Sequence, residues 1–158
     1  MSDRSTWLCP LLALALALGS ATPTVAEDTS LLVIVNPSVH SAELSADRLE
    51  AIFTMSERAW PGGQTIIPFN YPPGTGLRET FDRAVLRMSP DEVARFWIDR
   101  RIRGMGDAPR KVPTVALLLR VVANLHGAIG YVPAGPMPAD VKVVARVSGG
   151  RVLRTGGR

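Results

Sequence analysis

Continuous apolar runs predict the strands of this chain. Leu31 to Val35 is unbroken by polar residues and is closed by Asn36-Pro37, which is typical of a strand covered on both faces. Three further segments predict strands: Gln64 to Phe69, Ala128 to Val132 and Val141 to Val144. Pro68 suggests that the second of these is an edge strand or is about to end.

Apolar residues at helical spacing alternate with these runs. Such spacing places them on one face of a helix, which then packs against a sheet. Four segments predict helices: Ser45 to Phe53 with Leu49, Ile52 and Phe53 inward; Leu77 to Met88 with Leu77, Phe81, Ala84, Val85 and Met88 inward; Pro90 to Arg103 with Val93, Phe96 and Trp97 inward; and Val115 to Leu125. Two begin with good caps, Ser45 in one and Ser89-Pro90-Asp91-Glu92 in the other.

Repeated alternation of strand and helix predicts the fold class. Crossover helices connect parallel strands and cover their faces, so we expect a three-layer α/β sandwich with a mixed sheet. Ser148-Gly149-Gly150 predicts a terminal hairpin through Val152-Leu153. No repeat or linker divides residues 27–158, which we interpret as a single domain.

Residues 1–26 have the order of features of a secretory signal peptide. Arg4 precedes the apolar stretch Leu8 to Leu18, and Thr24-Val25-Ala26 supplies small residues for cleavage near Ala26. The apolar stretch is too short to cross a bilayer as a helix. The alternative interpretation of residues 1–26 is a buried helix of the folded protein. We therefore predict a periplasmic or secreted protein, which loses its only cysteine, Cys9, with the signal.

Composition excludes several function classes. Of the 158 residues, 46% are hydrophobic and 20% charged, which disfavours a disordered chain. The net charge of +4 comes mainly from arginine, with a basic run between Arg95 and Lys111. This run predicts either attraction to anions or a solvated basic face. Export and the absence of aromatic residues alternating with the basic ones argue against nucleic acid as a partner.

One loop has the residues of an anion site. The segment Pro72 to Gly76 leads from a predicted strand directly into a predicted helix. Glycines let backbone N–H groups turn toward one point, and a helix start adds unpaired donors and partial positive charge. Thr75 could donate its hydroxyl to the same ligand, and Arg78 could add a charge. The alternative is that Thr75 only caps the helix and the glycines only turn the chain.

Signatures of catalysis are scarce. His40 and His126 have no metal-ligand spacing to a second ligand, and the chain has no G-x-S-x-G nucleophile motif. Gly74-Thr75-Gly76 lacks the lysine of a phosphate-binding loop that hydrolyses nucleotides. We therefore predict no enzyme activity, no catalytic residues, no metal and no cofactor.

The order of segments resembles the phosphate-binding proteins of ABC transporters. The resemblance covers most of residues 31–144. It rests on these stretches taken in order: Leu32-Val33-Ile34-Val35-Asn36-Pro37, Ser45 to Phe53, Trp60-Pro61-Gly62-Gly63, Pro72 to Phe81, and Gly127-Ala128-Ile129-Gly130-Tyr131-Val132. It implies a periplasmic-binding-protein-like lobe, in a family whose members hold an oxyanion between two α/β lobes with helix N-termini and short hydroxyl side chains.

The chain departs from that family at the loop and in length. The family loop commonly reads Arg-x-x-Gly-Ser-Gly-Thr-Arg, whereas here Asn70 stands where the arginine is expected, Thr75 replaces the serine and Leu77 the threonine. The chain is also roughly half as long as family members. We expect a short, single-lobe member that binds phosphate or another small oxyanion modestly. The predicted ligand-binding residues are Asn70, Gly74, Thr75, Gly76 and Arg78.

Two other functions compete with oxyanion binding for ABC-type transport. In the first, the lobe is a protein-interaction or sensory module that has lost tight phosphate binding. Its partner would be an envelope membrane protein or a second copy of the chain. The second is a secreted hydrolase, for which the residues offer little support.

Overall fold

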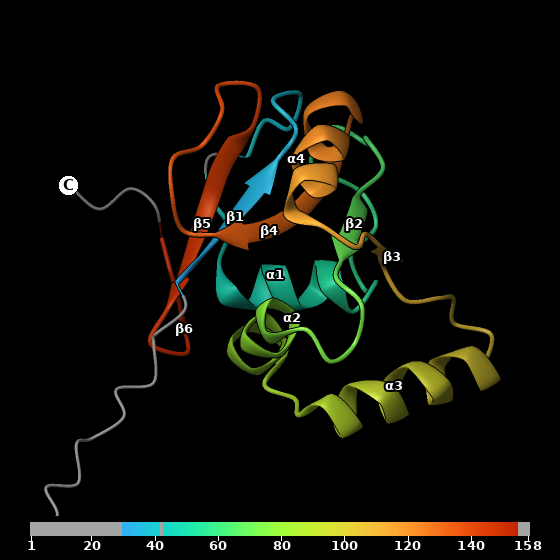
Figure 1. The fold of residues 1–158 in the computed structure, drawn as a ribbon. Coiled ribbons are helices and arrows are strands. Elements are labelled where there is room, and N and C mark those ends of the chain that lie inside the picture. The colour runs from blue at the N-terminus through green and yellow to red at the C-terminus, as the bar shows by residue number, and fades with distance from the viewer. Residues whose placement is uncertain (1–29, 42, 155–158) are drawn as a thin grey trace, which may run out of the picture.

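A computed structural model describes residues 30–41 and 43–154, which form a mixed six-stranded sheet with helices on both faces (Figure 1). The strands lie in the order β3-β2-β4-β1-β5-β6. In chain order the elements are β1 (Leu31–Val35), α1 (Ala46–Phe53), β2 (Ile67–Asn70), α2 (Gly76–Phe81), the π-helix η1 (Asp82–Leu86), α3 (Pro90–Ile102), β3 (Arg110–Lys111), α4 (Val115–Asn124), β4 (Ala128–Pro133), β5 (Lys142–Ser148) and β6 (Arg151–Leu153). The predicted α/β class with a mixed sheet is confirmed.

The sheet has a parallel half and an antiparallel half. Strand β2 pairs in parallel with both β3 and β4, and helices make the crossovers between these three strands. Strand β1 pairs antiparallel with β4 and β5, and β5 continues into β6 by the predicted hairpin. The loop predicted to bind an anion follows the carboxyl end of β2, in the parallel half. Ligands of open α/β sheets commonly bind beside such ends.

Two helical layers cover the sheet. Helix α4 lies on one face, with α1 and α2 on the other (Figure 1). Successive residues of β4 face opposite helical layers. Tyr131 packs on Phe53 and Phe81, whereas Gly130 lies against Leu118 of α4. The rings of Phe81 and Tyr131 stack with their centroids 3.9 Å apart. All five residues of β1 are buried, as its unbroken apolar run predicts.

The predicted helix starts are confirmed. The Ser45 hydroxyl accepts from the Arg48 N–H, and Leu49, Ile52 and Phe53 are buried. At Ser89 the reciprocal capping box forms with Glu92, and Pro90 is the first residue of α3. Helix α4 begins after Thr114, whose hydroxyl accepts from the Leu117 N–H. Local sequence is sufficient for these starts because each cap lies within one turn of its partner.

The second predicted strand differs from the structure in its start and in its position. Strand β2 begins at Ile67, three residues later than expected, and Thr65 forms only an isolated bridge with Ala59. It also lies between β3 and β4 and so is not an edge strand. The sequence predicted no strand at β3, which lies at the end of the basic run between Arg95 and Lys111. Pro68 is tolerated because β3 pairs only from Phe69 onward. The Ile67 N–H points toward β4, so the Pro68 nitrogen faces the side with no partner strand at that position.

The predicted helix over 77–88 is two elements. Helix α2 ends at Phe81 and passes into η1, which Arg87 closes at a φ of 57°. The wider turn buries Ala84, Val85 and Leu86 in succession, a pattern that an α-helix of regular period does not produce. Phe81, Ala84 and Val85 are buried as predicted, while Leu77 and Met88 are half-buried. Strand β5 runs four residues past the predicted end at Val144, while the ends of α3, α4 and β4 differ from prediction by one residue each.

The predicted signal segment, residues 1–26, lies outside the described residues. Within 30–41 and 43–154, none of the helices has the length and apolar character needed to cross a membrane.

Candidate functional site

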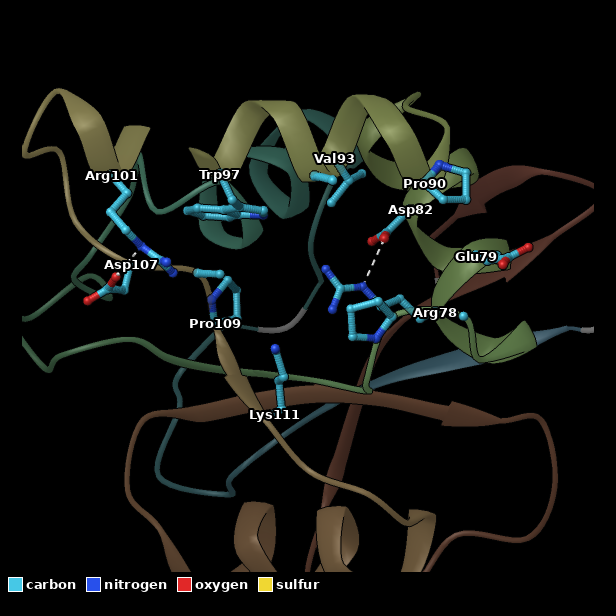
Figure 2. A pocket seen from close by; sticks show the side chains of 14 residues that line it. Arg78, Glu79, Asp82, Pro90, Val93, Trp97, Arg101, Asp107, Pro109 and Lys111 are labelled. Atoms are coloured by element: carbon cyan, nitrogen blue, oxygen red, sulfur yellow. Dashed lines mark hydrogen bonds and ion pairs between the residues drawn. The ribbon is translucent and has the colours of Figure 1, made fainter. Parts of the chain in front are cut away.

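A cavity of about 440 Å³ opens beside the loop that follows β2 (Figure 2). Helix α3 forms one wall, α2 and η1 form another, and the segment from Asp107 into β3 closes a third side. The lining residues are Pro73, Gly74, Arg78, Glu79, Asp82, Pro90, Val93, Ala94, Trp97, Arg101, Asp107, Ala108, Pro109 and Lys111. The cavity therefore joins segments separated by more than thirty residues in the chain.

The loop at 72–76 is ordered by its own hydrogen bond. Gly74 has a φ of 83°, which a residue with a side chain rarely adopts, and this turn lets the chain enter α2. The Thr75 hydroxyl donates to the Pro72 carbonyl over 3.0 Å and does not cap the helix. Thr75 is half-buried next to Gly74, and the hydrogen of its hydroxyl is already donated within the loop. The simple capping role left open by the sequence does not occur.

Arg78 and Asp82 form a buried ion pair in the wall of the cavity. The Arg78 Nε donates to Asp82 Oδ2 over 3.1 Å, and Arg78 Nη1 donates to the Tyr71 carbonyl over 2.9 Å. The two residues are 6% and 3% exposed. Burial raises the pKa of the Asp82 carboxyl above its usual value, and the Arg78 charge offsets this shift only in part. The second carboxylate oxygen, Oδ1, is buried without a hydrogen-bond partner among the described residues.

Asn70 lies on the inner side of the loop, away from the cavity lining. Its Oδ1 accepts hydrogen bonds from the Tyr71 N–H and from the Tyr131 hydroxyl. The Tyr71 hydroxyl in turn donates to the Tyr131 carbonyl over 3.1 Å. Burial raises the pKa of Tyr71 to about 12 and also raises that of Tyr131, so both hydroxyls stay protonated donors at neutral pH. This network joins β2 to β4 and orients the start of the loop.

Two cations at the cavity come from the stretch that the sequence showed only as basic. Lys111 ends β3 and points into the cavity from the side opposite α3 (Figure 2). Arg101 comes from the last turn of α3, with its Nε 3.4 Å from Asp107 Oδ1. Nothing in the local sequence separates Lys111 from its neighbour Arg110, which does not line the cavity. Only the strand pairing of β3 with β2 distinguishes them, because neighbouring strand residues face opposite sides.

The apolar part of the lining comes mainly from α3. Val93 and Trp97 point from this helix into the cavity, with Pro90 and Pro109 on either side of them (Figure 2). Pro73, from the loop, also lines the cavity. Val93 and Trp97 are also the only residues of α3 that the structure describes as buried. Both side chains belong to the buried hydrophobic core, as predicted for the inward face of this helix, and the structure shows that they also line the cavity.

The structure brings together some of the predicted ligand-binding residues and not others. Gly74 and Arg78 line the cavity, Thr75 and Gly76 adjoin it, and Asn70 lies behind the loop. That these five residues bind an anion stays a prediction.

The acidic, histidine and cysteine side chains of residues 30–41 and 43–154 form no group of three that could hold a metal ion. His40 and His126 are exposed residues of loop segments.

Solved structures with the same fold are phosphate-binding proteins by description. An ABC-type phosphate transport receptor from Vibrio cholerae aligns with a TM-score of 0.57 and 18% identity, over 74% of this chain and 45% of its own. A phosphate ABC transporter substrate-binding protein from Clostridium perfringens, solved with bound phosphate, has a TM-score of 0.59 and 15% identity over 73% and 45%. PstS from Borrelia burgdorferi has a TM-score of 0.52 and 16% identity over 67% and 42%.

The chain thus has the fold of a periplasmic-binding-protein lobe, as the sequence predicted, and spans less than half the length of each of these three proteins. No protein-family profile matches the sequence, and no curated protein matches it.

Proposed function

We propose that this protein is a solute-binding-protein-like domain that holds phosphate or another small oxyanion in the cavity beside the loop at 72–76, in connection with ABC-type transport. The observation that carries the proposal is the position of the loop: Gly74 and Arg78, predicted from sequence to bind an anion, line the same cavity as Lys111. The descriptions of the three structural neighbours support phosphate as the first ligand to test.

The charges at the cavity favour modest affinity. Arg78 and Arg101 are each paired with an aspartate, and Glu79 is paired with Arg83. Lys111 forms no ion pair within the described ranges, so it is the cation most able to meet an incoming anion. A hydrogen bond to a charged group contributes about 1.5–3 kcal/mol net. A site with few free donors then binds a strongly hydrated ion weakly, in the micromolar to millimolar range.

Isothermal titration of the purified protein with phosphate, sulfate and acetate tests this function. We expect measurable binding of at least one oxyanion. Lys111→Gln should weaken that binding roughly tenfold, since it removes one charge-assisted contact. The matched control is Arg110→Gln, which removes the same charge from the adjacent exposed position outside the cavity. Absence of heat for every oxyanion at millimolar concentration, or equal losses in the two variants, would contradict the proposal.

Thr75→Val separates a ligand hydroxyl from a structural one. The hydroxyl already donates to the Pro72 carbonyl. If the hydroxyl also contacts the anion, the loss of binding free energy in Thr75→Val should be larger than the loss in its free energy of unfolding. Equal affinity with a loss of about 1 kcal/mol in stability would assign Thr75 to loop structure alone.

Export to the periplasm or outside the cell completes the proposal. The order of features in residues 1–26 supports cleavage near Ala26. Expression of the full chain in a Gram-negative host should give a periplasmic product. Its intact mass should correspond to a chain that begins at Glu27. A cytoplasmic product of full mass would contradict this part of the proposal without affecting the binding test.

A second candidate function is protein interaction by self-association. It is favoured by the outer flank of α3, where Ile98 and Ile102 are 59% and 80% exposed, with Met105 just beyond the helix. Exposed apolar side chains grouped in this way are common at contact surfaces. Light scattering with size exclusion would show a dimer that Ile102→Asp disrupts, whereas a monomer that binds an oxyanion would favour the first function.

A further inference from the structure

The cavity is much larger than a phosphate ion requires. Its volume of about 440 Å³ equals roughly fifteen waters at about 30 Å³ each. A tetrahedral oxyanion has only five heavy atoms. Cavities of about 300–1,000 Å³ with mostly apolar walls and a few polar groups are typical of sites for organic ligands.

Apart from Glu79 and the exposed Arg101–Asp107 pair, the polar side chains of the lining lie at two places and impose opposite conditions on a ligand. Lys111 offers a free positive charge on the side opposite α3. Near Arg78, the Asp82 side chain is only 4% exposed, and its Oδ1 has no hydrogen-bond partner among the described residues. A fully deprotonated oxyanion placed beside that oxygen would be repelled and would give it no hydrogen bond, whereas a protonated one could donate only through its P–OH group. An oxyanion is therefore best accommodated at the Lys111 end, away from Asp82.

Between these places the wall is apolar. Val93, Ala94 and Trp97 lie on the cavity side of α3, one turn apart from each other or adjacent. The Trp97 ring faces the cavity interior in Figure 2. An ion alone would leave this surface in contact with water, whereas an apolar substituent would cover it and gain free energy in proportion to the apolar area buried.

We propose that the ligand is an organic oxyanion: a phosphoryl or phosphonyl group bound at Lys111 and attached to an apolar, preferably aromatic, body that packs on Trp97 and Val93. This inference rests on the proposed function and narrows its substrate class. Free inorganic phosphate would be a minimal ligand that occupies only the Lys111 end.

The test compares phosphate, methylphosphonate and phenylphosphonate in titrations of the full chain. Phenylphosphonate should bind at least tenfold more tightly than methylphosphonate, because the head group is the same and only the apolar body differs. Phenylphosphonate binding should also change the tryptophan fluorescence. Loss of this change in Trp97→Phe would assign it to Trp97 among the three tryptophans of the chain.

A filling variant keeps the test independent of folding. Ala94 is an exposed residue of α3 that lines the cavity, so Ala94→Leu adds bulk there without disturbing buried packing. We expect it to weaken phenylphosphonate binding more than methylphosphonate binding, so that the preference for phenylphosphonate is lost. The control is Ala116→Leu, the same change at an exposed position of α4 outside the cavity.

The outcomes distinguish this inference from the proposed function. Equal affinity for the three ligands would overturn the inference and leave oxyanion binding supported. Binding of none would overturn both. A phenylphosphonate preference that Ala94→Leu does not reduce would also overturn the inference, since the apolar body would then lie elsewhere.

Discussion

Helices α3 and α4 are similar in length but are stabilised in different ways. Helix α4 packs on the sheet, with Leu118 and Val122 fully buried. Its last turn is also held from a distance, because Asn36 Nδ2 donates to the carbonyls of Val122 and Ala123 over 2.8 Å each. Helix α3 lies away from the sheet (Figure 1), and among its described residues only Val93 and Trp97 are buried. Its capping box is formed entirely within its own first turn.

This difference explains where the cavity lies. Most helical stability in proteins comes from an apolar face packed on other elements. Helix α4 uses its apolar face in this way, while α3 presents its own across the cavity toward the loop at 72–76. A helix with few buried contacts can also move or open at low cost in free energy. We therefore expect the sheet with α4 to determine stability and α3 to determine ligand access and specificity.

The largest expected effect is at Gly127, in the connection from α4 to β4. Its φ is 78°, and a Cβ atom there would lie 2.1 Å from the Thr65 carbonyl oxygen. Gly127→Ala should lower the free energy of unfolding by about 4 kcal/mol, from backbone strain and overpacking together. Urea unfolding measures this. Gly76→Ala is the control: its Cβ would meet no atom within 4 Å, and we expect a change below about 0.5 kcal/mol.

The next effect compares the two helices directly. Leu118→Ala, at a fully buried position of α4 against Gly130, should cost about 3 kcal/mol. Ile98→Ala, on the exposed flank of α3, should cost less than about 0.5 kcal/mol. Similar losses at the two sites in urea unfolding would show that α3 is packed as tightly as α4, contrary to our interpretation.

Loss of the capping box should affect α3 locally. Ser89→Ala removes the hydroxyl that accepts from the Glu92 N–H, which we expect to cost about 1 kcal/mol. Hydrogen exchange followed by mass spectrometry should show faster exchange in peptides from residues 90–102, with no change in 115–124. Equal acceleration in both helices would contradict the independence of α3.

The smallest effects are on pH dependence, with opposite signs for two carboxyls. Hydrogen bonds from Ser89 lower the pKa of Glu92. The stability that the Glu92 carboxylate contributes is therefore complete above the usual glutamate pKa and is lost as pH falls through the lowered value. Burial raises the pKa of Asp82, so stability decreases as pH rises from the usual aspartate value to the raised one. In urea unfolding between pH 3 and 6, the free energy of unfolding of Glu92→Gln should decrease less on acidification than that of the unmodified protein.

Asp82→Asn tests the opposite sign. It should remove the decrease in stability on raising pH in that interval, because an amide does not titrate. An unchanged pH profile in this variant would mean that the Asp82 carboxyl has the same pKa in the folded and unfolded chain.

Sequence determined those features whose causes lie within a few neighbouring residues. The caps at Ser45 and Ser89, the buried strand at 31–35 and the terminal hairpin are confirmed for this reason. The α/β class followed from their order along the chain. Of the candidate site, the loop at 72–76 and Arg78 were recognised because glycine and a basic residue at a strand-to-helix junction are a local signal.

Tertiary structure alone decided the features that depend on distant partners. Strand β3 exists only because β2 offers it a parallel edge, and that pairing directs Lys111 rather than Arg110 to the cavity. Asn70 is engaged by a tyrosine sixty-one residues away, and Trp97, a residue of the hydrophobic core, also lines the cavity. A local pattern specifies which face of an element is apolar, but the partner of that face is selected by the packing of the whole chain.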